Sequence, residues 1–531
     1  MFKTLLAAAS TTALLAGLSF STATIAQDDA DQRLGTVHFP TTCNETAQRR
    51  FDRAMRFQHS FWYRQSEEVF ADTLKADPDC AIAYWGIALS LLLNPHNAPP
   101  PENLPRGLAA LERGKAIGAK SQRERDYIDS LLALYTAHDK VPRGARLQVY
   151  LKAVEALAQR YPDDDEAQIN YAITLNVSAS PNDKSFAQQL RGAAILEPLF
   201  KRQPRHPGVA HYLIHLYDYP AIADKGLEAA RRYAGIAPSA PHALHMPSHI
   251  FTRVGAWADS IASNTASKNA ARASREPGDA VHASDYMVYA FLQIGQDRRA
   301  SEIVAELYAT TGNPDAFGMS FGMAASPARY VMERGDFKGA SELRVPSTRV
   351  PQVEAVTLFA RAIGSARSGK IETIKDDISR LAELRDKLVG ARDAYWAEQV
   401  DIQRQIASAW LLFAEGKHEP ALNAMSAAAN AEDRTEKSPV TPGPIVPARE
   451  LYGAMLLERG LARPALNAFE ATLKKEPHRL GATIGAAQAA EKAGDTAKAQ
   501  LHHAAVVALT ENADPVRPEI AASRAFVAKG R

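Results

Sequence analysis

The feature that most constrains this chain of 531 residues is a repeat of 34 positions. Small residues recur at this spacing at Gly192, Gly226 and Ser260, and again at Ala465 and Ala499. A proline follows twelve positions after several small residues of this kind, namely at Pro78, Pro204, Pro238 and Pro477. Because proline does not continue a helix, the spacing predicts helix–turn–helix units, with the small residue near the start of each second helix. Such units stack along one direction and each contacts only its neighbours.

The spacing and the residue types resemble the tetratricopeptide repeat (TPR). The clearest unit covers residues 47–80 and carries Ala54, Phe57, Ser66, Phe70 and Pro78. Sustained alternation of polar and apolar residues, the pattern of strands, is nearly absent. We therefore predict an all-α, TPR-like superhelix (solenoid) of about ten to twelve helix pairs between residues 44 and 510.

The first 26 residues have the three parts of a secretory signal peptide. Lys3 supplies the positive start, residues 5–20 are apolar or small, and Ala26 ends a cleavage site. We expect cleavage near Ala26 and a periplasmic or secreted protein without a transmembrane segment in the mature chain. The alternative is a signal anchor that stays in the membrane, for which the apolar stretch is short.

The remaining chain divides by composition and repeat pattern. We predict an N-terminal extension (27–43), a TPR-like array (44–431), a Pro-rich loop (432–447), a C-terminal TPR pair (448–510) and a C-terminal tail (511–531). A second Pro-rich segment, residues 94–105, falls between the two helices of one unit, and we expect both Pro-rich segments to be extended surface loops.

The chain has two cysteines, Cys43 and Cys80. An even number of cysteines in an exported protein indicates a disulfide. Both residues precede predicted helices that should be neighbours, so we predict that they are bonded to each other. The alternative is two separate thiols.

Charge and motifs exclude several classes of function. The chain has 62 Lys and Arg against 60 Asp and Glu, so its charge offers no attraction for nucleic acid. It lacks the nucleophile elbow of hydrolases, the phosphate-binding loop of nucleotide-binding enzymes and the glycine fingerprint of dinucleotide-binding domains. We expect a binding protein rather than an enzyme.

Histidine is concentrated in one part of the repeat. Seven of the 15 histidines lie between residues 206 and 282, at His206, His211, His215, His242, His245, His249 and His282. His211 and His215 are four residues apart, and His245 and His249 repeat this pair 34 positions later. Residues at this spacing lie on one face of a helix, so the four rings should converge between two adjacent first helices.

Three interpretations of this cluster are open. The first is a zinc, copper or other transition-metal site at His211, His215, His245 and His249, with Asp218, His242 or Asp285 completing it. The second is a concave groove for a peptide, a partner protein or a small ligand, lined by His211, His215, Asp218, His242, His245, His249, Arg253, His282, Asp285 and Tyr289. The third is a structural role in joining helices. A zinc-peptidase helix is disfavoured because Tyr212 and Met246 stand where that motif has Glu.

Several sequence blocks resemble those of exported bacterial TPR proteins. They are residues 48–63, 77–90, 122–135, 206–220 and 241–255, and the resemblance covers residues 35–300. It implies the fold and the periplasm, but no reaction. We therefore expect a periplasmic TPR-type binding or scaffolding protein with a His-rich groove. The alternative is a metal-binding protein with zinc or copper at the histidine cluster. This alternative includes a metal-dependent enzyme.

Overall fold

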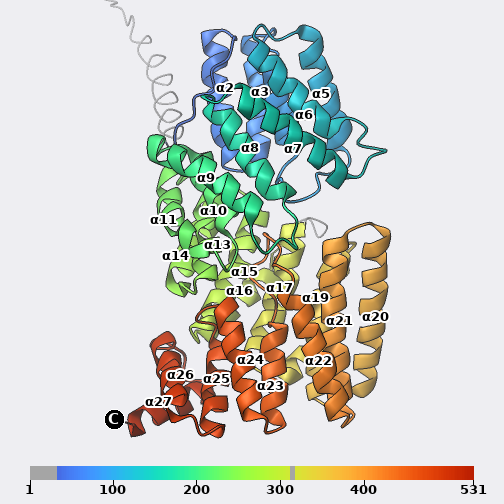
Figure 1. The fold of residues 1–531 in the computed structure, drawn as a ribbon, viewed down its shortest axis with the longest axis vertical. Helices are drawn as coiled ribbons and strands as arrows, with labels where there is room; N and C mark the ends of the chain where they lie inside the picture. The colour runs from blue at the N-terminus through green and yellow to red at the C-terminus, as the bar shows by residue number, and fades with distance from the viewer. Residues whose placement is uncertain (1–32, 311–316, 531) are drawn as a thin grey trace, which may run out of the picture.

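The computed structural model describes residues 33–310 and 317–530, and within these ranges every regular element is a helix. The predicted signal peptide lies outside the described residues. Consecutive helices pack in pairs that stack into a curved superhelix (Figure 1). The prediction of an all-α, TPR-like solenoid is therefore confirmed.

The first part of the stack contains eight helices between the N-terminal extension and the histidine-rich repeats. They are α2 (Glu45–His59), α3 (Tyr63–Ala76), α4 (Ile82–Leu91), α5 (Asn103–Ile117), α6 (Gln122–Tyr135), α7 (Arg143–Arg160), α8 (Asp165–Ser178) and α9 (Ala187–Arg202).

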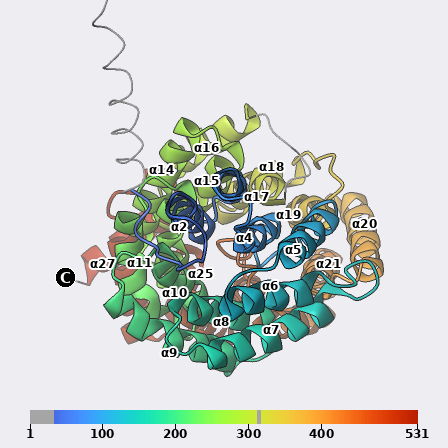
Figure 2. The ribbon, with the colours of Figure 1, turned by 90° about the horizontal axis from the view of Figure 1, so that it is seen from above.

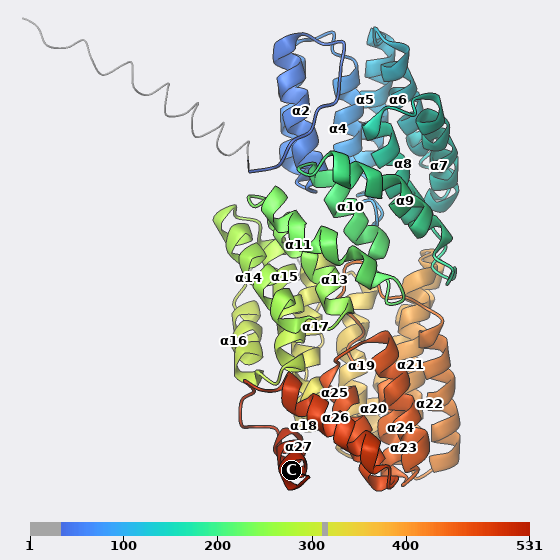
Figure 3. The same cartoon turned by 60° about the vertical axis from the view of Figure 1, so that its left-hand side comes forward.

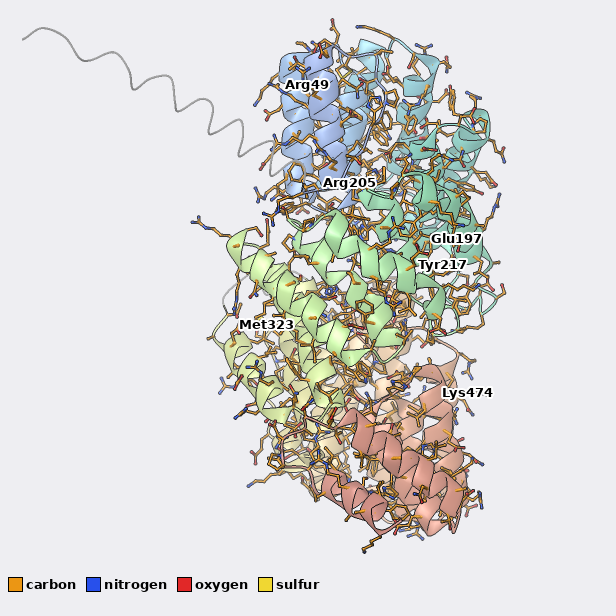
Figure 4. The ribbon with its side chains drawn as sticks, turned by 90° about the vertical axis from the view of Figure 1, so that its left-hand side faces the viewer. Arg49, Glu197, Arg205, Tyr217, Met323 and Lys474 are labelled. Carbon is orange, nitrogen blue, oxygen red and sulfur yellow. A yellow bond between two sulfur atoms is a disulfide. The ribbon has the colours of Figure 1, made fainter. Side chains whose placement is uncertain are left out.

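The central part contains the histidine-rich first helices and their partners. Its elements are α10 (Pro207–Tyr217), η1 (Ala223–Gly226), α11 (Leu227–Ile236), α12 (Pro241–His245), α13 (Pro247–Arg253), α14 (Trp257–Ala273), α15 (Pro277–Gln293), α16 (Asp297–Tyr308), α17 (Phe317–Glu333) and α18 (Phe337–Ser341). Tyr217 of α10 donates a hydrogen bond to Glu197 of α9 over 2.6 Å, where these two helices pack (Figure 4).

The last part ends on the side of the molecule away from α2 (Figure 1). It comprises α19 (Pro351–Arg367), α20 (Ile371–Gly390), α21 (Ala394–Ala414), α22 (His418–Asp433), α23 (Ala448–Glu458), α24 (Ala462–Lys475), α25 (Leu480–Lys492), α26 (Thr496–Leu509) and α27 (Pro518–Lys529). Seen from above, the helices follow one another around the long axis (Figure 2).

The small residues of the repeat explain the close pairing of helices. A Cβ atom on Gly192 would lie 2.7 Å from the side chain of Leu216, and one on Gly226 would lie 2.7 Å from Ile250. Ser260, at the same position of the next unit, is fully buried. The second helix of each unit therefore approaches the next first helix too closely for a larger side chain.

The N-terminal extension is joined to the array. Cys43 and Cys80, the predicted disulfide pair, are bonded with an S–S distance of 2.00 Å. Phe39 is fully buried against Phe51 of α2, and the backbone amide of Thr36 donates to the carbonyl of Arg205, which is labelled in Figure 4.

Two segments differ from their predicted form. Residues 511–531 were expected to be a tail, but they contain α27, whose Ile520 is buried against the preceding pair. Arg517, before α27, forms a buried ion pair with Asp297 at the start of α16, so the segment between α26 and α27 lies beside α16 (Figure 3).

The Pro-rich loop 432–447 was expected to be an exposed loop, but much of it is buried. Ser438, Thr441, Ile445 and Val446 are each less than a tenth exposed. Arg329 of α17 donates hydrogen bonds to the carbonyls of Gly443 and Pro444. The loop is held inside the superhelix because these contacts satisfy its backbone acceptors.

Candidate metal centre

Three consecutive first helices bring six histidines together. His211 and His215 lie on α10, His242 and His245 on α12, His249 on α13 and His282 on α15. Pro247 separates α12 from α13, since proline lacks the amide hydrogen. The backbone of Met246 stays in the right-handed helical region, so His245 and His249 still lie on one face.

The first group consists of His211, His215 and His242. Nε2 of His211 lies 3.1 Å from Nε2 of His215 and 3.1 Å from Nε2 of His242. One ring nitrogen of each residue lies within 4.8 Å of the other two, so all three could reach one ion.

The second group consists of His245, His249 and His282. Nε2 of His245 lies 3.0 Å from Nε2 of His249, and the rings of His245 and His282 have centroids 4.3 Å apart. The hydroxyl of Tyr286 is 3.4 Å from Nε2 of His249. Three ring nitrogens again lie within 4.8 Å of one another.

The two groups have the same construction. Each takes two histidines four positions apart from one first helix and a third from the next first helix. The groups touch, because the ring centroids of His242 and His245 are 6.1 Å apart, as are those of His215 and His249. The four histidines predicted to share one ion are thus divided between the two groups.

Neighbouring acceptors orient three of the rings. Nδ1 of His211 lies 2.7 Å from the carbonyl oxygen of His59, and Nδ1 of His249 lies 2.9 Å from a carboxylate oxygen of Asp218. Nδ1 of His245 lies 2.6 Å from Oδ1 of Asn264, whose amide nitrogen donates to Ser260. Each Nδ1 must carry the hydrogen, which leaves the lone pair on Nε2.

Burial keeps the rings neutral. It lowers the pKa of His211 and of His282 to about 3, and it holds the pKa values of His215, His242 and His245 well below the ordinary value. Neutral imidazole is the form that binds a metal, so the cluster is in the ligand form at neutral pH.

Asp218 connects the second group to the Pro-rich loop. One oxygen accepts from Arg253 over 2.8 Å, and the other accepts from His249 and from Lys437, each over 2.9 Å. Burial would raise the pKa of Asp218, but Lys437, Arg253 and His249 outweigh it and hold the pKa well below the ordinary value. Asp218 is therefore ionised and accepts the hydrogen bond that orients the ring of His249, as carboxylates do for metal-bound histidines.

Asp285 and Tyr289 were predicted to line the same groove, but their side chains bond residues outside the two histidine groups. Asp285 pairs with Arg329 at 3.3 Å, and Tyr289 donates to Glu476 and accepts from Arg479, each over 3.0 Å. These contacts fasten α15 to α17 and to the C-terminal pairs.

A third cluster, His59, Glu166 and His206, does not fit a metal. Its two histidines donate to different oxygens of Glu166 over 3.0 and 2.9 Å. Nδ1 of His59 bonds Tyr212, and Nδ1 of His206 accepts from a backbone amide. Because every ring nitrogen has a hydrogen-bond partner, we interpret this cluster as a structural hydrogen-bond network.

The sequence did not indicate five further residues of the centre, which are His96, Phe61, Asn264, Lys437 and Tyr286. The ring of His96, from the Pro-rich segment 94–105, lies 4.6 Å from that of His215, and Phe61 packs on His211 at 4.3 Å. Asn264 and Lys437 come from a second helix and a loop. His96 and Lys437 carried a signal, since each lies in a Pro-rich segment that interrupts the repeat.

The donor set suits particular metals. Three neutral imidazoles favour zinc, copper or nickel over magnesium or calcium, which prefer oxygen. Zinc held by three histidines keeps one position for water or another ligand. Each group could therefore bind an ion and leave it accessible to a further ligand.

Solved structures with low TM-scores are similar to this chain, each at 11–12% identity. No family model and no curated protein matches the sequence. The human IFIT1 dimer with m7Gppp-AAAA is 12% identical, over 90% of this chain and 98% of that chain, with a TM-score of 0.36. Naa15/Naa10 bound to HypK-THB is 12% identical over 87% of this chain and 75% of that chain, with a TM-score of 0.23. The Cut9–Hcn1 hetero-tetramer of the APC/C is 11% identical over 91% and 95%, with a TM-score of 0.28.

None of the helices described in this chain is both long and apolar enough to cross a membrane.

Proposed function

We propose that this protein binds two transition-metal ions, zinc or copper, in the two adjacent three-histidine groups. The first ion would be held by His211, His215 and His242, and the second by His245, His249 and His282. The TPR-like array would serve as a rigid frame that places equivalent helices side by side.

The observation that carries this proposal is the pair His245 and His249. Both rings donate through Nδ1, to Asn264 and to Asp218, so both Nε2 atoms carry lone pairs. These two atoms lie 3.0 Å apart. Two facing lone pairs repel each other unless a cation lies between them, and burial disfavours a proton in that role. A metal ion between the two Nε2 atoms would accept both lone pairs.

Adjacent ions would form a dinuclear centre. Two-metal sites in enzymes hold their ions about 3.5–4 Å apart and share a small bridging ligand. The contact between the two groups, at ring-centroid distances of 6.1 Å, is compatible with such sharing. The centre would therefore be competent for metal-assisted chemistry on a small oxygen ligand.

Binding of a peptide or partner in a His-rich groove is the second candidate. Groove binding by first-helix residues is what the TPR resemblance implies. The exposures of His211, His215, His245 and His249, between 0% and 4%, favour a small ion over a peptide at these rings. A peptide would contact other parts of the array.

Metal analysis tests the proposal. Protein purified without added metal, and then loaded with Zn²⁺ or Cu²⁺, should hold two ions per chain by inductively coupled plasma mass spectrometry. His242→Ala and His245→Ala should each hold one, and the double variant none. His138→Ala, at a histidine outside all three clusters, is the control. Unchanged metal content in both single variants would sink the proposal.

We further propose that the protein is exported, which rests on the N-terminal signal-like residues. Mass spectrometry of the mature chain should find a new N-terminus at Gln27. A chain that retains Met1 would contradict export by cleavage.

A further inference from the structure

A cavity of about 90 Å³ lies among the first helices, outside the histidine groups. Its wall is mostly apolar and aromatic, and includes Phe61, Trp85, Tyr150 and Tyr212. The Pro-rich segment 94–105 forms one side through Pro95, Asn97 and Pro99. Phe61 separates the cavity from the first histidine group, because its ring packs on His211, His215 and His242.

Three polar groups on this wall are donors without acceptors. Nε1 of Trp85, the hydroxyl of Tyr63 and Nδ2 of Asn170 are buried and have no hydrogen-bond partner. Trp85 is only 2% exposed, and its indole can only donate. Unpaired buried donors are costly, so the wall is suited to a ligand that brings acceptor oxygens.

Two arginines add unbalanced positive charge. Arg143 donates to the carbonyl of Pro95 over 2.6 Å, and Arg146 donates to the carbonyls of Leu134 and Val141. Among the described residues, the hydrogen bonds of both guanidinium groups go to backbone carbonyls and not to carboxylates. Glu166 also lines the cavity, but both its oxygens are taken by His59 and His206. The positive charges of Arg143 and Arg146 on this wall are therefore not balanced by a neighbouring anion.

We propose that the cavity binds a small aromatic carboxylate. The carboxylate would accept hydrogen bonds from Arg143 and Arg146, and its ring would pack among the aromatic side chains of the wall. Such a ligand would lie one aromatic ring away from the first histidine group. This inference goes beyond the proposed metal centre and does not depend on a bound metal.

Calorimetric titration of the metal-free full chain tests the proposal. The probes are benzoate, phenylacetate and 3-phenylpropionate, each compared with its neutral amide. At least one acid should bind with one site per chain and at least tenfold more tightly than its amide. If no acid binds, or if acids and amides bind equally, the proposal is overturned whatever the metal content.

Matched variants locate the site. Arg143→Gln should weaken the binding of the acid at least tenfold, whereas Lys152→Gln removes the same charge from an exposed position of α7 and should have no effect. Tyr63→Phe, which keeps the ring and removes the unpaired hydroxyl, should weaken binding several-fold and guards against misfolding of the arginine variant. Unchanged affinity in Arg143→Gln and Tyr63→Phe would overturn the assignment.

Discussion

Asn264 offers a sharp test of the metal centre because it touches a proposed ligand without being one. Its Oδ1 accepts from Nδ1 of His245 over 2.6 Å, and its side chain is fully buried on α14. In Asn264→Ala, His245 loses the acceptor that keeps its hydrogen on Nδ1. The ring can then place the hydrogen on Nε2, the atom that would bind the metal.

The magnitude follows from this loss of orientation. Removing the partner of a metal-bound histidine costs about 10–100-fold in metal affinity, which is about 1.4–2.7 kcal/mol. Only the second group should be affected, because Asn264 contacts none of His211, His215 and His242. One of two Zn²⁺ ions should therefore bind more weakly.

Competition titration of Zn²⁺ against a chromophoric chelator measures the two affinities separately. Asn264→Asp, which keeps an acceptor oxygen, should restore the affinity, and Asn269→Ala, at an exposed position of α14, should leave both sites unchanged. If Asn264→Ala leaves both affinities unchanged, or lowers both equally, the reasoning is wrong.

Three further predictions concern stability. Zn²⁺ at 100 times its dissociation constant should stabilise the chain by about 2.7 kcal/mol per site, so chelation should lower the melting temperature in calorimetry; an unchanged temperature would argue against metal binding. Replacing Cys43 and Cys80 by Ser should cost about 4 kcal/mol in the chain-entropy model, measured by urea unfolding, and a cost near zero would contradict it. Burial raises the pKa of Glu432 from 4.5 to about 7, so its contribution to stability is complete below pH 4.5 and is lost as the pH rises through 7. Glu432→Gln should therefore lose less stability than the wild type between pH 5 and pH 8 in thermal melts, and equal losses would refute this.

The repeat period allowed much of the fold to be predicted. Small residues 34 positions apart locate second helices, and the buried positions of Gly192, Gly226 and Ser260 bear this out. The return of the C-terminal pairs onto α15 was not predictable in the same way. It depends on Arg479, whose partners Glu333, Glu450 and Tyr289 lie far from it in the sequence.

The sequence predicted which histidines belong to the candidate centre, but not how they divide into two groups. The i,i+4 spacing and the repeat locate His211, His215, His245 and His249 on equivalent faces. The spacing does not say that His242 joins the preceding pair, because this depends on how far α12 is rotated against α10. His282 occupies the same place relative to Asp285 that His242 occupies relative to His245. The two groups are therefore related by the repeat, and only the stacking of the helices shows this relation.

The parts of the centre that break the repeat come from the two Pro-rich segments. Segment 94–105 supplies His96 against the first group and wall residues of the cavity, and segment 432–447 supplies Lys437 to Asp218 behind the second group. A solenoid can place the same side chain at equivalent positions of successive units, but it cannot close one end of a groove differently from the other. Insertions can close the two ends differently, because their sequences do not follow the 34-residue repeat. If the two groups bind metal with unequal affinity, the cause should lie in these two segments and in the different partners of the rings, which are Asn264 and Asp218 for the second group and the carbonyl of His59 for the first.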